Sequence, residues 1–296
     1  MRFLNAAGSF FTFLLAVCIG TLWAVEYYYD SENTVIGGIS YHTVTKGETL
    51  LDIARRYGLG YNDLALVYPN MDVWLPPVGK RLMVPSFWVL PSAERKGIVL
   101  NIPELRLYFY SSEPGTVQTY PVGIGDEGWE TPLGSYRIGQ KRTNPTWYIP
   151  KSLQGKYGRS IIPPGPDNPL GAYIMKLAGT SYGIHGTNMP WGVGRLVSHG
   201  CIRLYPEHIT KLFAQVRVGT PVKIIYEPIK WGQKRGRIYV EVHPDVYKKI
   251  LDFRGYAVRA LNQCPFGTKR VDRDRYFLAV RLKNGVPFDV TVNKDP

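Results

Sequence analysis

Residues 182–204 bring together the side chains that cysteine catalysis needs. Cys201 directly follows Gly200, so the backbone can turn sharply there and expose the sulfur. A thiol becomes a nucleophile when a neighbouring imidazole takes its proton, and His185, which ends an expected strand, can supply that imidazole. The backbone amides of Gly200 and Cys201 can stabilise a developing oxyanion. The stretch predicts nucleophilic catalysis by Cys201, with no cofactor.

A general base also needs a group that orients its second ring nitrogen. The sequence places no carboxylate close to His185. We therefore expect the backbone carbonyl of Gly186 to take this role.

The same residue types allow two other interpretations. A metal site could draw its ligands from His185, His199, Cys201 and His208. However, the His-x-Cys spacing is tighter than the usual spacing of zinc ligands, and no second cysteine is close. A His and a Cys could also simply pack in a β-barrel wall. Two histidines, a cysteine, an arginine and several glycines in one short stretch favour catalysis, with no metal.

The stretch closely resembles the catalytic motif of the L,D-transpeptidase (YkuD-like) family, H-G-x(11)-S-H-G-C-[IV]-R. The matching residues are His185, Gly186, Ser198, His199, Gly200, Cys201 and Arg203. The segments "GIVLNIPELRLYFY", "PVGIG", "TPLGSYRI" and "PPGPDNPLG" stand in the order found in the periplasmic branch of that family. The resemblance covers residues 96–228.

The resemblance implies a role for each matching residue. Cys201 would attack the carbonyl of the L-centre of diaminopimelate in a stem tetrapeptide and expel the terminal D-alanine. His185, oriented by Gly186, would shuttle the proton, and Gly200 with Cys201 would supply the oxyanion amides.

His199 and Arg203 would shape the site and contact the carboxylates of the donor. Ser198 would be a hydrogen-bonding support rather than a nucleophile. Aromatic side chains near the motif are expected in the donor groove, although packing in a β-domain would explain them equally well: Trp147, Tyr173, Tyr182 and Trp191.

The acceptor of the acyl group stays open at this point. It could be the amine of another stem, which gives a 3-3 cross-link, or a lysine on an outer-membrane lipoprotein. Water as acceptor would make the enzyme an L,D-carboxypeptidase. A third alternative is a non-catalytic scaffold that binds the wall, although a scaffold has no need of a thiol.

The elements that position the motif are expected to be mainly β, a sandwich or barrel with short helices. A helix is expected over 205–216, with Pro206 at its start, and a strand over 221–227. Residues 142–171 are rich in Pro and Gly and show no period, which predicts a functional loop or lid.

A small module with the order β-α-α-β is expected at 41–86. Thr49 caps a first helix, Gly58 ends it, and a second helix is expected after Asn62. The opening "VTKGETLLDIA" and the closing "GKRLMVP" resemble a LysM domain. This resemblance implies binding of peptidoglycan glycan strands.

The remaining segments are a leader and a tail. Residues 1–26 carry Arg2 and then an apolar run, which predicts a signal peptide or a membrane anchor and hence export to the periplasm or cell envelope. A contact with the inner membrane is expected only if this segment stays uncleaved. Residues 232–296 predict a small α+β subdomain, with a helix over 245–253 and strands over 237–242, 275–282 and 288–292.

The formal net charge is +13, with basic residues concentrated after residue 230. A basic surface can meet nucleic acid, anionic lipid or an acidic wall polymer. No nucleic-acid-binding signature accompanies the charge, so nucleic acid is disfavoured as a partner. A solvated basic face explains the charge as well.

Overall fold

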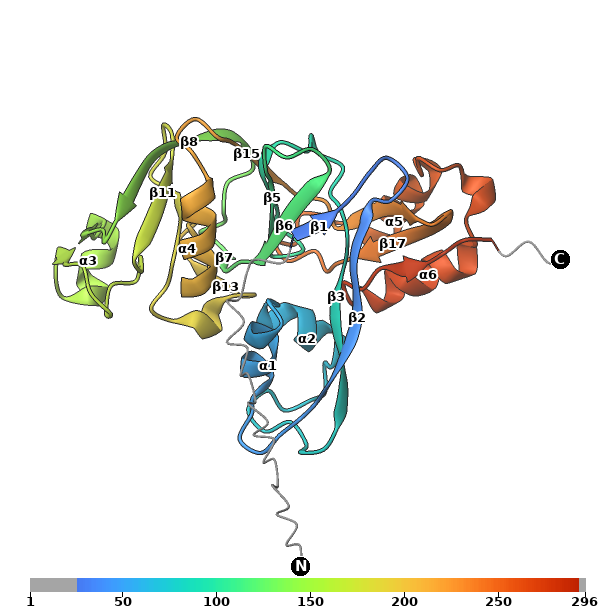
Figure 1. The fold of residues 1–296 in the computed structure, drawn as a ribbon, viewed down its shortest axis with the longest axis horizontal. Helices are drawn as coiled ribbons and strands as arrows, with labels where there is room; N and C mark the ends of the chain where they lie inside the picture. Colours follow the sequence, from blue (N-terminus) through green and yellow to red (C-terminus); the bar gives the residue numbers. More distant parts are fainter. Residues whose placement is uncertain (1–25, 293–296) are drawn as a thin grey trace, which may run out of the picture.

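The computed structural model describes residues 26–292. The expected leader at 1–26 therefore lies outside the described residues, except for Glu26. In the part of the chain that is described, no helix has both the length and the apolar character needed to cross a bilayer. The fold is mainly β, as predicted, with few and short helices (Figure 1).

A nine-stranded sheet with the order β1-β6-β5-β4-β15-β8-β11-β12-β14 forms the centre of the molecule (Figure 1). The β4–β15 and β12–β14 pairs are parallel and the others antiparallel. Its strands are β1 (Glu26–Tyr28), β4 (Gly97–Asn101), β5 (Arg106–Tyr110), β6 (Thr116–Pro121), β8 (Gly134–Thr143), β11 (Tyr173–Leu177), β12 (Gly183–His185), β14 (Ile202–Arg203) and β15 (Pro221–Ile225).

This sheet is covered on both faces, which explains why β4 and β5 are buried at every position. Successive side chains in a strand point to opposite faces. Leu107 and Phe109 belong to the core beneath helix α4 (Pro206–Gln215), whereas Tyr108 and Tyr110 pack toward the N-terminal unit. The strand therefore joins two cores. Helix α4 lies where a helix was predicted, with Pro206 at its first turn.

Smaller elements surround the loop that precedes Cys201. They are β7 (Ile124–Gly125) paired with β13 (Leu196–Ser198), β9 (Trp147–Tyr148) paired with β10 (Ile161–Ile162), helix α3 (Lys151–Tyr157) and the 3-10 turn η1 (Pro190–Gly192). The segment 142–171, expected to be an irregular loop, thus contains a short hairpin and a helix. Two-residue strands and a helix without buried residues give no periodic sequence signal.

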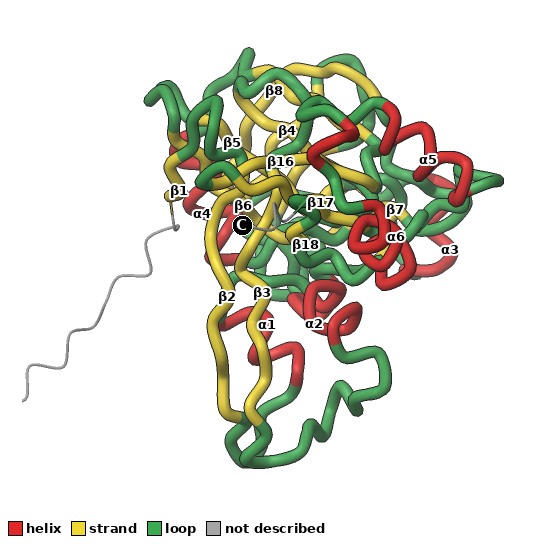
Figure 2. The backbone as a smooth tube through the Cα atoms, turned by 90° about the vertical axis from the view of Figure 1, so that its right-hand side faces the viewer, coloured by secondary structure: helices red, strands yellow, loops and turns green. Residues whose placement is uncertain are grey.

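The N-terminal unit is a long hairpin of β2 (Val35–Thr43) and β3 (Arg81–Val89), with α1 (Leu50–Arg56) and α2 (Tyr61–Val67) packed beside it (Figure 2). Thr49 caps α1 as predicted, and its side chain and that of Asp52 form a capping box. One expectation was wrong in detail, because α2 begins before Asn62, directly after Gly60. Residues 27–40 contribute to β1 and form most of β2.

The C-terminal unit is α+β, as predicted, with β16 (Ile229–Lys234), β17 (Arg237–Val242) and β18 (Phe288–Asp289) beside α5 (Phe253–Asn262), the 3-10 turn η2 (Thr268–Arg270) and α6 (Arg273–Leu282). The strand over 237–242 is confirmed, but the last expected strand shortens to Phe288–Asp289, followed by a single bridge from Thr291 to Val271.

Two elements of this unit were predicted wrongly. The helix expected over 245–253 is a turn, because the Asp245 carboxylate accepts hydrogen bonds from the amides of Lys249 and Ile250 and ends regular structure there. The strand expected over 275–282 is helix α6. Asp272 caps α6, and its buried residues Tyr276, Ala279 and Val280 follow helical spacing.

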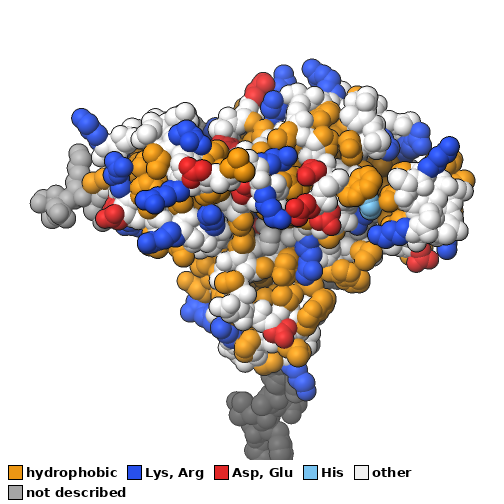
Figure 3. Space-filling model, turned by 180° about the vertical axis from the view of Figure 1, so that it is seen from behind, with side chains coloured by type: hydrophobic (Ala, Val, Ile, Leu, Met, Phe, Trp, Pro, Cys, Tyr) orange, Lys and Arg blue, Asp and Glu red, His pale blue; other side chains and the backbone are white. Residues whose placement is uncertain are grey.

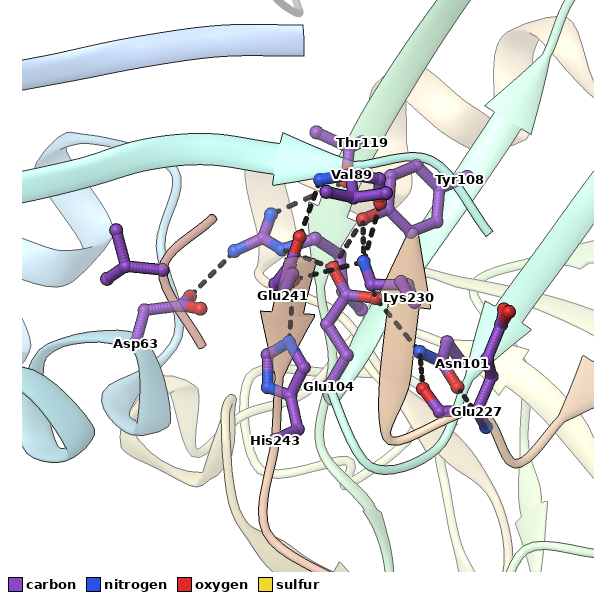
Figure 4. Close-up of polar contacts among 12 residues, drawn as sticks. Asp63, Val89, Asn101, Glu104, Tyr108, Thr119, Glu227, Lys230, Glu241 and His243 are labelled. Carbon is purple, nitrogen blue, oxygen red and sulfur yellow. Dashed lines mark hydrogen bonds and ion pairs between the residues drawn. The ribbon is translucent and has the colours of Figure 1, made fainter. Parts of the chain in front are cut away.

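A buried cluster of charged side chains joins the three units (Figure 4). The Lys230 ammonium lies 2.8 Å from the Glu104 carboxylate and 3.0 Å from that of Glu241, and all three side chains are fully buried. Arg106 pairs with Asp63 of α2 at 2.6 Å. The Glu241 carboxylate also accepts a hydrogen bond from the backbone amide of Val89. These contacts connect β3, β17 and the central sheet. We call these residues, with Tyr108 and His243, the junction cluster.

The junction cluster also contains a group with metal-ligand chemistry. The ligand atoms of Glu104, Glu241 and His243 lie within 4.8 Å of one another. The Lys230 ammonium stands between the two carboxylates and fills the place of a cation. These groups form an ion-pair network in which the lysine supplies the positive charge.

The face seen in Figure 3 carries Lys and Arg side chains spread among hydrophobic and acidic ones. The basic side chains do not gather there into one continuous patch. This distribution agrees with a solvated basic face.

Candidate active site

A cavity of about 300 Å³ contains the cysteine and the first histidine of the motif. Its walls are β11, β12, β14 and the segment 142–171. Three cationic side chains line it, and no carboxylate does so among the described residues: Arg142, Lys176 and Arg203. The cavity therefore favours an anionic ligand.

The pairing of β12 with β14 sets the relative positions of Cys201 and His185. These strands are parallel, with His185 opposite Arg203 and Ile184 opposite Ile202. Side chains two residues apart share one face of a strand, so Cys201 and Arg203 share the face on which His185 lies. Both Cys201 and His185 line the cavity as diagonal neighbours in this register.

The His185 ring is fixed by a backbone carbonyl. Its Nδ1 lies 2.6 Å from the carbonyl oxygen of Gly186, and because a carbonyl only accepts hydrogen bonds, Nδ1 carries the proton. The other nitrogen, Nε2, is then the basic one. Burial, with the charges of Arg203 and Lys176, lowers the pKa of His185 to about 3. The resting imidazole is neutral and able to accept a proton.

The Cys201 thiol is also neutral at rest. Burial raises its pKa above the usual value. A hydrogen bond from the Gly183 amide and the charges of Lys176 and Arg203 act in the opposite direction. The pair therefore rests as a thiol and an imidazole rather than as an ion pair.

Ser198 holds the turn that precedes Cys201. Its hydroxyl donates to the carbonyl of Cys201 at 2.6 Å and accepts the Gly200 amide at 3.1 Å. Gly200 has φ +96°, and a Cβ there would lie 2.3 Å from the Tyr182 ring, so only glycine fits. The Gly200 amide is thus already bound, whereas the Cys201 amide has no hydrogen-bond acceptor within residues 26–292.

His199 and Arg203 lie beside this turn. His199 is half-buried and meets the ring of Trp129 edge-on at 5.0 Å. Burial and the charges of Lys156 and Arg203 lower its pKa. The Nε of Arg203 is buried and has no hydrogen-bond partner among residues 26–292, and burial lowers the pKa of this guanidinium. Arg203 thus keeps donor capacity for a ligand.

The segment 142–171 forms one wall of the cavity. The side-chain amide of Asn168 is buried and donates hydrogen bonds to the backbone carbonyls of Pro145, Ile162 and Pro163. These bonds hold the two ends of the segment together. Of the expected aromatic residues, Trp147 and Tyr182 line the cavity. Tyr173 packs on Phe213, and Trp191 is 55% exposed outside the cavity lining.

The N-terminal unit docks on the loop between His185 and Cys201. The Tyr61 amide at the start of α2 donates to the Val193 carbonyl at 3.1 Å, and Arg195 covers the Tyr61 ring at 3.8 Å. A Cβ on Gly194 would lie 2.3 Å from the Tyr61 nitrogen, so this contact requires glycine. The unit is a fixed neighbour of the catalytic loop.

The residues considered for a metal site do not assemble. In the described part of the chain, His185, His199, Cys201 and His208 form no cluster of ligand atoms, and His208 lines a different cavity. Cys201 and Cys264 are both free thiols.

Sequence reasoning missed four residues of the site. Arg142 and Lys176 add positive charges to the cavity, Trp129 contacts His199, and Thr131 donates to the carbonyl of Gly200 at 3.1 Å. Two of them carried a sequence signal: Arg142 opens the segment 142–171, and Thr131 opens the "TPLG" segment that matches the family order. Lys176 and Trp129 carried none.

Comparison with known proteins agrees with this geometry. The family profile of the YkuD L,D-transpeptidase catalytic domain matches residues 95–224, and that of the LysM domain matches residues 42–67. The chain is 35% identical to the probable L,D-transpeptidase YcfS of Escherichia coli, over 95% of this chain and 93% of the relative. The chain belongs to the L,D-transpeptidase family. It is an enzyme of that family with a LysM domain, and these domains together imply binding to peptidoglycan.

Two further relatives match over most of their length, and one solved structure matches over less than half of this chain. The chain is 34% identical to the probable L,D-transpeptidases ErfK/SrfK and YbiS of E. coli, over 95% and 90% of this chain and 95% and 92% of theirs. The catalytic domain of the Enterococcus faecium L,D-transpeptidase is 24% identical, with 46% of this chain and all of that one covered and a TM-score of 0.36.

Proposed function

We propose that this L,D-transpeptidase acts through a thioester on Cys201. The sulfur attacks the carbonyl at the L-centre of diaminopimelate in a stem tetrapeptide, and His185 Nε2 accepts the thiol proton. The tetrahedral intermediate collapses, the bond to the terminal D-alanine breaks, and His185 returns the proton to the leaving amine.

One observation carries this proposal. The 2.6 Å contact between His185 Nδ1 and the Gly186 carbonyl fixes the tautomer that leaves Nε2 as a base. The low pKa of His185 keeps that base unprotonated at neutral pH. A histidine that only packed in the wall would need no such orientation beside a thiol.

The lining of the cavity supports the proposed donor. A stem tetrapeptide carries several carboxylates, and the cavity offers the cations Arg142, Lys176 and Arg203 without a competing carboxylate among the described residues. Arg203, with its free Nε, is the proposed partner of a donor carboxylate. Trp147 and Tyr182 provide apolar walls.

The acceptor is proposed to be an amine. Attack of an amine on the thioester forms an amide and frees the thiol, which gives a 3-3 cross-link when the amine belongs to another stem. A lysine of an outer-membrane lipoprotein fits the same chemistry. The LysM domain would hold the glycan strand during transfer, in the periplasm or cell envelope.

The test measures D-alanine release from disaccharide-tetrapeptide, with and without an added diaminopimelate-containing acceptor. We expect release by the native protein, none by Cys201→Ala, and a new amide product when the acceptor is present. Release without any amide product would make the enzyme an L,D-carboxypeptidase. A folded native protein that releases no D-alanine would contradict the catalytic proposal and favour a wall-binding scaffold.

A further inference from the structure

The C-terminal unit reaches the catalytic domain through one buried tyrosine. Tyr247 is 8% exposed and lies in the turn after β17. Its hydroxyl donates to the Gly125 carbonyl at 2.8 Å and accepts the Thr131 amide at 3.2 Å. Both hydrogen-bonding directions of the hydroxyl are used, so Tyr247 fixes the segment 125–131 from the side.

Tyr247 is itself held in place by Tyr226. The backbone amide of Tyr247 donates to the Tyr226 hydroxyl at 3.0 Å, and the rings of the two tyrosines stack with their centroids 6.2 Å apart. The Tyr226 hydroxyl in turn donates to the Asp245 carboxylate, which caps the turn. The turn is therefore a rigid support for the hydroxyl of Tyr247.

Thr131 continues this chain of contacts to the nucleophile. Its side chain is buried, and its hydroxyl donates to the carbonyl of Gly200 at 3.1 Å while accepting the Gly125 amide at 2.9 Å. Gly200 immediately precedes Cys201. A continuous hydrogen-bonded path thus runs from Tyr247 through Thr131 to the Gly200–Cys201 peptide bond.

A planar trans peptide places its C=O and its following N–H on opposite edges of one plane. Fixing the Gly200 carbonyl therefore fixes the direction of the Cys201 N–H. Within residues 26–292, this N–H has no hydrogen-bond acceptor, whereas the Gly200 amide is bound to Ser198. Cys201 N–H is the amide left free to donate to an oxyanion.

We infer that Tyr247 and Thr131 are positioning residues for the oxyanion site: they set the orientation of the Gly200–Cys201 peptide and thereby aim Cys201 N–H at the developing charge. The inference rests on the proposed function, because an oxyanion forms only when Cys201 attacks a carbonyl. It assigns a catalytic purpose to the C-terminal unit, which otherwise carries no chemistry.

The experiment compares Tyr247→Phe, Thr131→Val and the double variant in the full-length protein. The first readout is kcat and KM for D-alanine release from disaccharide-tetrapeptide. The second is the rate at which iodoacetamide alkylates Cys201, resolved by peptide mass spectrometry with Cys264 as internal reference. Alkylation of a thiol develops no oxyanion, so it reports the nucleophile alone.

We expect each single variant to lower kcat by about tenfold, less than the 10²–10³ that removal of an oxyanion donor costs. KM and the pH profile of Cys201 alkylation stay at the native values. The double variant falls no further than the stronger single variant, because both residues act on one peptide. Thr131→Ser keeps the hydroxyl and restores the native kcat.

Tyr239→Phe is the matched control. It changes a tyrosine in the same unit whose hydroxyl makes no hydrogen bond within the described residues, and we expect it to leave kcat unchanged.

A native kcat in Tyr247→Phe overturns the inference. An equal loss of the rates of acylation and alkylation also overturns it, because such a loss indicates a general disruption of the fold. Effects that multiply in the double variant also overturn it. A native protein that releases no D-alanine defeats the proposed function instead, and Thr131→Ala replaces Thr131→Val if the latter does not fold.

Discussion

The active site and the junction cluster use the same kinds of side chain in opposite ways. In the junction cluster, Lys230 contacts two carboxylates and Arg106 contacts a third, so the buried charges meet opposite charges. In the active site, His185 and Cys201 are kept neutral by burial, and the buried Arg203 guanidinium pairs with no carboxylate among the described residues. The buried charges of the junction cluster are paired without a ligand, whereas the charge of Arg203 is not.

The difference indicates which cluster does chemistry. A buried charge that is already paired has little left to offer a substrate, whereas breaking its pair is strongly destabilising. A buried neutral acid and base with free donors beside them can change charge when a substrate arrives. Substitutions in the junction cluster should therefore change stability, and those in the active site should change rates.

His185→Gln gives the largest expected effect on rate. It removes the base but keeps an amide of similar size, and we expect kcat to fall about 10³–10⁴-fold. The free energy of unfolding should change by about 1 kcal/mol, the value of one hydrogen bond. D-alanine release and urea unfolding of the same samples measure both. A variant that keeps native kcat would show that another group is the base.

Lys230→Met gives the largest expected effect on stability. It leaves Glu104 and Glu241 facing each other in a buried site, and we expect a loss of about 3–5 kcal/mol in the free energy of unfolding. Urea unfolding measures this loss. Lys248→Met is the matched control, because Lys248 pairs with Glu127 on the surface and its removal should cost less than about 1 kcal/mol. Equal costs for the two variants would contradict the account of the junction cluster.

Arg203→Lys tests the free guanidinium. The charge is kept but the planar fork is lost, so KM for the tetrapeptide should rise about tenfold with a smaller change in kcat. Steady-state D-alanine release measures both constants. Arg217→Lys, on the exposed surface, should leave both unchanged. An unchanged KM in Arg203→Lys would remove this residue from the donor site.

The smallest expected effect concerns pH and stability. Burial lowers the pKa of His185 to about 3 and that of His208 to about 4, from an ordinary value of 6.5. Between pH 6.5 and about 4 the unfolded chain binds protons that the folded chain does not, so the free energy of unfolding falls as the pH is lowered. His208→Phe should reduce this slope by up to about 1.4 kcal/mol per pH unit. Urea midpoints across this range measure the slope, and an unchanged slope would show that His208 is not a buried neutral group.

The local contacts of the motif around Cys201 were easier to predict from the sequence than the elements of the C-terminal unit. The motif around Cys201 has a fixed spacing, and the Gly186 carbonyl could be named because the sequence offers His185 no carboxylate nearby. The role of Thr131 could not, because it depends on a contact across 69 residues. Helix α6 was mistaken for a strand because its aromatic and β-branched residues favour strands, whereas the cap at Asp272 and tertiary packing decided otherwise.

The most direct test of the account is intact-mass spectrometry of the protein mixed with disaccharide-tetrapeptide, alongside Cys201→Ala and His185→Gln. The account predicts a thioester adduct with the mass of the donor less D-alanine on the native protein, mapped to Cys201, a slower adduct on His185→Gln and none on Cys201→Ala. An adduct that persists in Cys201→Ala would contradict the claim that Cys201 and His185 form the nucleophile and its base. A native protein that releases D-alanine from the donor but never shows the adduct would contradict it as well.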